Sequence, residues 1–199
     1  MSRPEMSTER STVWRLVPVL VAIASLAACG ARATRPDIAS KGPRQSHVEI
    51  RDSSVDALPD YRVPVTPDLV FAIVDIDADA VVFRLRHRPD SFDPAITRFV
   101  IDLDTDQNAA TGSQGIEYSV VVFPAGGRGA DVARKTGAGE TIAGTVPVTF
   151  VADGCDVALP LSLLGSDDGR FDFRVRVYAQ PAWPLVVDVL PDVGLVRID

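Results

Sequence analysis

Hydrophobic and polar residues alternate along short segments of the chain. In VVFRLRHR (81–88), Val81, Phe83 and Leu85 share one face, and three arginines share the other. FDFRVRVYA (171–179) repeats the pattern, with Phe and Val on one face and charged residues and a tyrosine on the other. A period of two is typical of half-buried β-strands. We therefore predict a strand over each segment.

Further strands are predicted by a set of short apolar runs. These runs lie at 71–77, 98–104, 118–123, 146–152 and 185–190. Glycine, proline, aspartate and asparagine separate the runs, as turns require. No segment keeps a helical period for three turns, and only PLSLLG (160–165) predicts one short helical turn. Many short strands joined by turns favour an all-β antiparallel β-sandwich, and we expect residues 47–199 to form it as a single domain.

The first 28 residues have the features of a secretory signal peptide. Arg3, Arg10 and Arg15 precede an apolar run that extends from Leu16 to Cys29. A charged start, a short apolar core and small residues at its end are typical of such signals. The run is shorter than the about 20 apolar residues of a membrane-spanning helix. We therefore predict that residues 1–28 are removed on export.

The end of this run, Leu26-Ala27-Ala28-Cys29, resembles the lipobox of bacterial lipoproteins. The resemblance implies cleavage before Cys29, lipidation of Cys29, and a protein anchored at the bacterial cell membrane with its folded domain outside the cytoplasm. Residues 29–46 are polar and contain two prolines, so we expect a flexible tether. The membrane contact would then be the lipid anchor alone.

Charge and motifs narrow the classes of function. The chain carries 27 acidic and 20 basic residues, a net charge of −7, which argues against a nucleic-acid partner. Neither a hydrolase nor a phosphate-loop motif occurs, and His47 and His87 are the only histidines. Cys155 alternates with Val157 and is expected in the core rather than at a reactive site. We expect a binding protein rather than an enzyme.

The candidate metal-ligating residues lie in one segment, VIDLDTDQNAATGSQGIEY (100–118). Asp102 and Asp104 share one strand face, and Asp106 continues the same parity into a turn. Calcium takes six to eight oxygen ligands, with carboxylates and loop carbonyls among the typical ones. The candidate metal ligands are Asp102, Asp104, Asp106, Asn108 and Glu117.

Two interpretations of these carboxylates remain open. The spacing begins like an EF-hand loop but lacks glycine at the sixth position and has Ser113 at the twelfth, so it is not an EF-hand. A bound cation is one interpretation. The other is solvation, or pairing of Asp102 and Asp104 with Arg84 and Arg86 on a neighbouring strand.

Several segments together resemble a known class of domains. In order along the chain they are DLDTDQNAATG, GIEYSVVVF, LPLSLLGSDDGRFDFRVRV and DVLPDVG. They resemble exported bacterial β-sandwich domains related to family 9 carbohydrate-binding modules and the DOMON superfamily. The resemblance covers residues 47–199 and implies a jelly-roll-like sandwich, with sugar or haem binding in some relatives. Met1 and Met6 are the only methionines and lie in the predicted signal, so haem held by Met and His is not expected.

Sugar-binding modules stack sugar rings on exposed aromatic side chains. Trp183 is the only tryptophan outside the predicted signal, and Tyr178 lies on the polar face of its strand beside Arg174 and Arg176. These four residues are the candidate ligand-binding set, and the alternative role for Trp183 is an apolar lid over one end of the sandwich. The sequence thus leaves two functions open. One is a module for carbohydrate or cell-wall glycan with a structural calcium ion, and the other is a structural lipoprotein that binds another envelope protein.

Overall fold

The computed structural model describes residues 46–53, 56–58, 65–77, 79–127, 129–165, 169–179 and 185–199. The predicted signal peptide, Cys29 and Trp183 therefore lie outside the described residues. One compact unit spans Ala39–Asp199. Its described residues form twelve β-strands and one short 3-10 helix.

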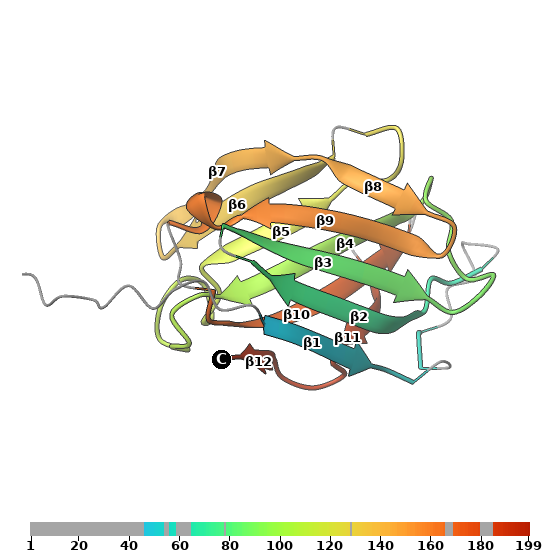
Figure 1. The fold of residues 1–199 in the computed structure, drawn as a ribbon, viewed down its shortest axis with the longest axis horizontal. Coiled ribbons are helices and arrows are strands. Elements are labelled where there is room, and N and C mark those ends of the chain that lie inside the picture. The colour runs from blue at the N-terminus through green and yellow to red at the C-terminus, as the bar shows by residue number, and fades with distance from the viewer. Residues whose placement is uncertain are drawn as a thin grey trace, which may run out of the picture. The chain divides into compact units, whose positions relative to one another are not determined.

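The first sheet has five strands, all paired antiparallel. In spatial order they are β1 (Ser46–Arg51), β2 (Leu69–Ile76), β3 (Ala80–His87), β9 (Gly154–Pro160) and β8 (Val148–Val151). Figure 1 shows this sheet in front, with β8 uppermost and β1 lowest.

The second sheet has seven strands, again all antiparallel. Its order is β11 (Val186–Leu190), β10 (Phe171–Ala179), β4 (Thr97–Asp104), β5 (Tyr118–Val122), β6 (Ala130–Thr136) and β7 (Gly139–Val146), with β12 (Val196–Ile198) also paired to β10. It lies behind the first sheet in Figure 1. The predicted all-β antiparallel sandwich is confirmed.

The core fills the space between the two sheets with the alternate residues of each strand. On β3 the apolar face that the sequence predicted is fully buried. The Phe83 ring packs against Phe173 of β10 at a centroid distance of 5.5 Å and against Phe171 at 6.1 Å. Aromatic pairs at such distances stabilise a core beyond their buried area. The two segments with the clearest alternation thus face each other across the sandwich.

One local prediction is confirmed and one is wrong. The helical turn is present as η1 (Leu161–Leu164), and Gly165 ends it with a φ of 76°. The predicted run 146–152 is not one strand, because β7 ends at Val146 and β8 begins at Val148. Pro147 lies between them, and proline lacks the N–H that a continuous ladder would need.

Candidate functional site

Asp102 lies at the centre of a charged cluster on the outer face of the seven-stranded sheet. Ile101 and Leu103 of β4 are fully buried in the core, so the alternation of the strand turns Asp102 to the opposite face. The strands on either side place Arg174 of β10 and Ser119 of β5 directly opposite it. These side chains meet because the register aligns strands that are distant in sequence.

The carboxylate of Asp102 has several donors around it. Arg174 Nε donates to Oδ2 at 3.0 Å, and Arg176 Nη2 donates to Oδ1 at 2.9 Å. Ser119 Oγ donates to Oδ1 at 2.7 Å, and Lys135 Nζ lies 3.6 Å from the same oxygen. We call these five residues the Asp102 cluster.

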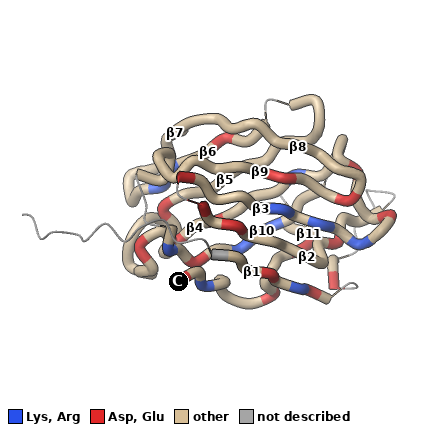
Figure 2. The backbone as a smooth tube through the Cα atoms, in the orientation of Figure 1, with Lys and Arg blue, Asp and Glu red and all other residues tan. Residues whose placement is uncertain are grey.

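The cluster is positively charged although the chain is acidic. Figure 2 shows basic and acidic positions interspersed over the strands of both sheets. Asp102 itself is only 1% exposed. Burial alone would raise the pKa of Asp102, but the hydrogen bond from Ser119 and the charge of Arg176 hold it below its usual value. Two arginines and one lysine therefore surround a single ionised carboxylate, which leaves an excess of two positive charges.

Tyr178 supports this cluster from its edge. Its hydroxyl oxygen accepts a hydrogen bond from Arg176 Nη1 at 2.8 Å. The residue is 4% exposed, and burial raises the pKa of its phenol. Of the predicted ligand-binding residues, Arg174 and Arg176 therefore lie together at the surface, whereas Tyr178 holds Arg176 in place and does not present an open ring.

The prediction that Arg84 and Arg86 pair with Asp102 and Asp104 is wrong. Arg84 and Arg86 lie on β3, which belongs to the five-stranded sheet. Arg84 pairs with Asp75, and Arg86 Nη1 pairs with Asp156 at 2.7 Å. Pairing by arginine is correct for Asp102, but the arginines come from β10.

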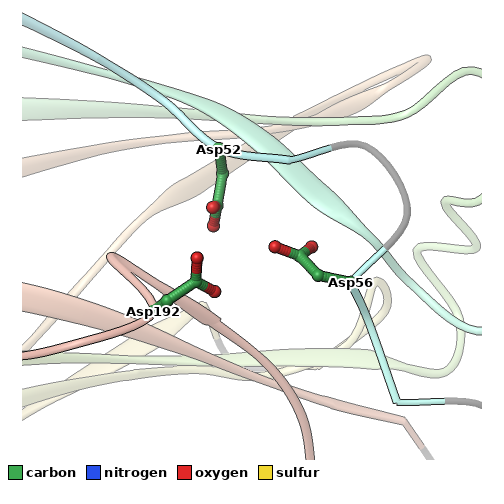
Figure 3. A group of neighbouring side chains, drawn as sticks. All are labelled: Asp52, Asp56 and Asp192. Atoms are coloured by element: carbon green, nitrogen blue, oxygen red, sulfur yellow. The ribbon is translucent and has the colours of Figure 1, made fainter.

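One group of three carboxylates lies where no sequence signal pointed. Figure 3 shows the carboxylates of Asp52, Asp56 and Asp192 directed toward one another, and one oxygen from each lies within 4.8 Å of the others. Burial, with the charges of Asp192 and Asp56, raises the pKa of Asp52 to about 6. The group was missed because Asp192 is about 140 positions from Asp52 and Asp56 in sequence, and only the fold joins them.

A second group of three carboxylates lies in the predicted calcium stretch. One oxygen from each of Asp104, Asp106 and Glu117 lies within 4.8 Å of the others. The loop itself supplies donors to them: Glu117 Oε2 accepts from the Thr105 N–H at 2.9 Å, and Glu117 Oε1 accepts from Thr111 Oγ1 at 2.7 Å. Such a group can hold a cation or can be satisfied by these donors.

Asn108 has a structural role in this loop. Its backbone N–H donates to one oxygen each of Asp104 and Asp106, both at 3.0 Å. Its side-chain oxygen accepts from the Ala110 N–H at 3.1 Å. The predicted set of five metal ligands is therefore divided: Asp102 belongs to the arginine cluster, Asn108 shapes the turn, and three carboxylates remain together.

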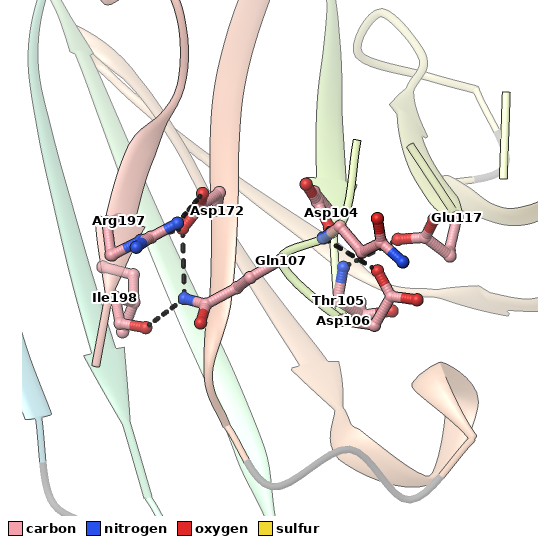
Figure 4. A network of polar contacts seen from close by, with 9 residues as sticks. Asp104, Thr105, Asp106, Gln107, Glu117, Asp172, Arg197 and Ile198 are labelled. Atoms are coloured by element: carbon pink, nitrogen blue, oxygen red, sulfur yellow. Dashed lines mark hydrogen bonds and ion pairs between the residues drawn. The ribbon is translucent and has the colours of Figure 1, made fainter. Parts of the chain in front are cut away.

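The loop is tied to the neighbouring strands. Figure 4 shows Gln107 reaching across to β10 and β12, where its Nε2 donates to Asp172 Oδ1 at 3.1 Å and to the Ile198 carbonyl at 3.2 Å. Arg197 binds the same Asp172 carboxylate through two hydrogen bonds of 3.0 Å. Negative charge is concentrated at this end of the sheet. Burial and the charges of Glu117 and Asp106 raise the pKa of Asp104.

Comparison with models of known protein families finds no match, and comparison with curated protein sequences finds none either. Within the part of the chain that the structure describes, no helix is both long and apolar enough to cross a membrane.

Proposed function

We propose that this protein is an exported, lipid-anchored binding module that holds a carbohydrate or cell-wall glycan on the outer face of its seven-stranded sheet. The observation that carries the proposal is the group of donors at the Asp102 cluster. Both Nη groups of Arg174 have no hydrogen-bond partner among the described residues. The ammonium of Lys135 lies 3.6 Å from Asp102, beyond hydrogen-bonding distance.

These donors are held in place rather than free to move. Asp102 is buried and holds Arg174 and Arg176 by hydrogen bonds, with Lys135 beside them. The side chains of Arg174, Arg176 and Lys135 are 36%, 26% and 21% exposed. Binding costs less conformational entropy when the donor side chains are already ordered. Sugar hydroxyls and carboxylates are acceptors that such donors bind. The proposed role is therefore binding without catalysis.

The test is co-sedimentation of the Cys29→Ser protein with purified cell-wall glycan and other insoluble polysaccharides. The substitution removes the predicted lipid, so any retention reports the folded domain. We expect retention by at least one glycan, and weaker retention for Lys135→Gln. Arg51→Gln is the matched control, because it removes the same charge from β1 of the other sheet, where the side chain is 80% exposed. Absence of retention by every glycan would contradict the proposal.

A calcium ion between Asp104, Asp106 and Glu117 is the structural part of the same proposal. Three converging carboxylates support it, because a cation relieves their mutual repulsion. We expect calcium to raise the thermal unfolding midpoint, since a ligand at a hundredfold excess over its Kd stabilises the native state by about 2.7 kcal/mol.

Two matched variants locate any calcium response. Asp104→Asn is expected to abolish it, and Asp192→Asn, which disrupts the other carboxylate group, is expected to keep it. If Asp192→Asn alone abolishes the response, the ion belongs to the Asp52 group. A midpoint that calcium does not change would remove calcium from the proposal and leave the glycan site unaffected.

A second candidate function is attachment to another envelope protein. It is favoured by β7, which lies at the edge of the seven-stranded sheet and exposes residues 139–143. Ile142 in this strand is 58% exposed. An exposed sheet edge is a place where a strand of a partner can pair. Crosslinking from position 142 in whole cells would identify such a partner.

A further inference from the structure

We infer that the Asp102 cluster selects glycans that carry carboxylate groups, such as chains of uronic acids, over neutral glycans. The inference rests on the proposed glycan-binding function and names the class of its ligand. It depends on the charge of the cluster and on the donors that the cluster leaves unused.

Three hydrogen bonds use most of the acceptor capacity of Asp102. A carboxylate offers about four lone-pair sites. Ser119 Oγ and Arg176 Nη2 donate to Oδ1, and Arg174 Nε donates to Oδ2. Arg176 Nε lies 2.8 Å from Oδ2 as an ion pair but makes no hydrogen bond. Lys135 Nζ lies 3.6 Å from Oδ1 and makes no hydrogen bond to it. The remaining donors of Arg174 and Lys135 are available only to solvent or to a ligand.

The charge count favours an anion. The cluster has three cations and one carboxylate. A neutral glycan would use the hydrogen bonds but leave the excess positive charge uncompensated. A ligand carboxylate would bind the outer donors as Asp102 binds the inner ones, through short charge-assisted hydrogen bonds.

The described acidic residues nearest the cluster form no ion pair with its cations. Glu140 of β7 lies opposite Lys135 in the strand register, but the two form no ion pair among the described residues. Asp172 lies two residues from Arg174 on β10, and its carboxylate accepts hydrogen bonds from Arg197 Nε and Nη2, each at 3.0 Å. Asp131 of β6 accepts from Thr145 Oγ1 at 3.1 Å and is 5% exposed. Asp104 lies beyond Asp102 at the acidic end of the sheet. An anionic chain is therefore expected over the middle of the sheet and away from that end.

The test is isothermal titration calorimetry of the full chain in detergent with two polymers. One is soluble polygalacturonate, and the other is the same polymer with its carboxyl groups reduced to alcohols. We expect polygalacturonate to bind at least tenfold more tightly, with an affinity that falls as salt rises because exposed charges are screened. Inorganic polyphosphate is the third probe and is expected to bind less tightly than polygalacturonate.

Three variants assign the binding to this cluster. Lys135→Gln and Arg174→Gln are each expected to weaken polygalacturonate binding severalfold, and Arg51→Gln is expected to leave it unchanged. Arg174→Gln also touches buried Asp102, so its thermal midpoint is measured first. The native Lys135 side chain makes no hydrogen bond within the cluster, so Lys135→Gln removes none. This variant therefore tests the site if Arg174→Gln fails to fold.

The outcomes distinguish failure of this inference from failure of the proposed glycan-binding function. Equal binding of the charged and reduced polymers overturns the inference and keeps the glycan-binding function. Binding of neither polymer, combined with no retention by insoluble glycans, overturns both. Equal or tighter binding of polyphosphate shows a general anion site and overturns the choice of carboxylate. Unchanged binding by both cluster variants places the site elsewhere and overturns the inference.

Discussion

His87 is a buried histidine at the end of β3. Its ring stacks on Phe92 at a centroid distance of 4.8 Å and lies 5.3 Å from Phe99. Neither ring nitrogen has a hydrogen-bond partner among the described residues. Burial lowers the pKa of His87 from 6.5 to about 3, because the charged imidazolium would lose its hydration there.

This burial predicts a loss of stability in acid. As the pH falls below 6.5, the unfolded chain binds a proton at His87, whereas the folded chain does so only near pH 3. The folded state therefore loses stability across this range, by about 3 kcal/mol from this residue between pH 7 and pH 4. Replacing His87 with Leu should remove this part of the loss. Urea unfolding at pH 7, 5 and 4 measures it, and an identical acid loss in the variant would contradict the prediction.

The ionisation of Asp188 should affect stability in the opposite direction, with a loss as the pH rises. It is 6% exposed and accepts hydrogen bonds from the N–H groups of Leu69 at 2.6 Å and Val189 at 2.8 Å. Burial raises the pKa of Asp188 from 3.8 to about 7. The folded carboxyl keeps its proton where the unfolded one has lost it, so its contribution is complete below pH 3.8 and is lost as the pH rises toward 7.

We expect Asp188→Asn to remove this loss, because an amide does not ionise. The free energy of unfolding of the variant, compared with the native chain, should decline less between pH 4 and pH 7.5. The His87→Leu protein provides the control, because its change in slope has the opposite sign. If Asp188→Asn left the slope unaltered, the carboxyl would already be ionised in the folded protein at neutral pH.

At the level of the elements, the contact between β9 and β3 depends on one glycine. A Cβ placed on Gly154 would lie 1.9 Å from the carbonyl oxygen of Leu85 and 3.2 Å from Arg86 Cα. Both atoms are backbone, so the two strands would have to separate. Gly154→Ala is therefore expected to destabilise the fold by more than about 2 kcal/mol.

Gly137→Ala is the matched control for this strand contact. Nothing lies within 4 Å of a Cβ at Gly137, and its φ is not in the left-handed region. Thermal unfolding of both variants should show a lower midpoint for Gly154→Ala alone. Equal midpoints would mean that β9 can shift away from β3 at little cost.

Prediction of the elements succeeded for the runs with the clearest alternation, whereas β1, β6, β7, β9 and β12 were not among the predicted strands. Residues 171–179 were predicted in full as β10, because one face fills the core and the other carries charge. β7 was missed because residues 139–143 are exposed on both faces, so no period of two remains. β12 has three residues, too few to show a pattern.

For the whole molecule, we expect the lipid predicted at Cys29 to hold the domain at a membrane. We expect the native chain to sediment with membranes and Cys29→Ser to remain in the soluble fraction, because two or more acyl chains hold a protein at a bilayer and none remain in the variant. Detection of both proteins by immunoblot after cell fractionation measures this. Membrane retention of the Cys29→Ser protein would show that its attachment does not need the lipid.

The sequence by itself determined the class of fold and which side of each strand faces the core. The alternation around Asp102 predicted that its carboxylate turns away from the apolar face, because adjacent strand residues point to opposite sides. It could not determine partners, since periodicity contains no information about which strands become neighbours. The tertiary structure decided that Asp102 meets Arg174 rather than Arg84, and it brought Lys135 and Ser119 beside them. The reason is physical: cross-strand pairing depends on sheet order and register, which the packing of the whole core selects.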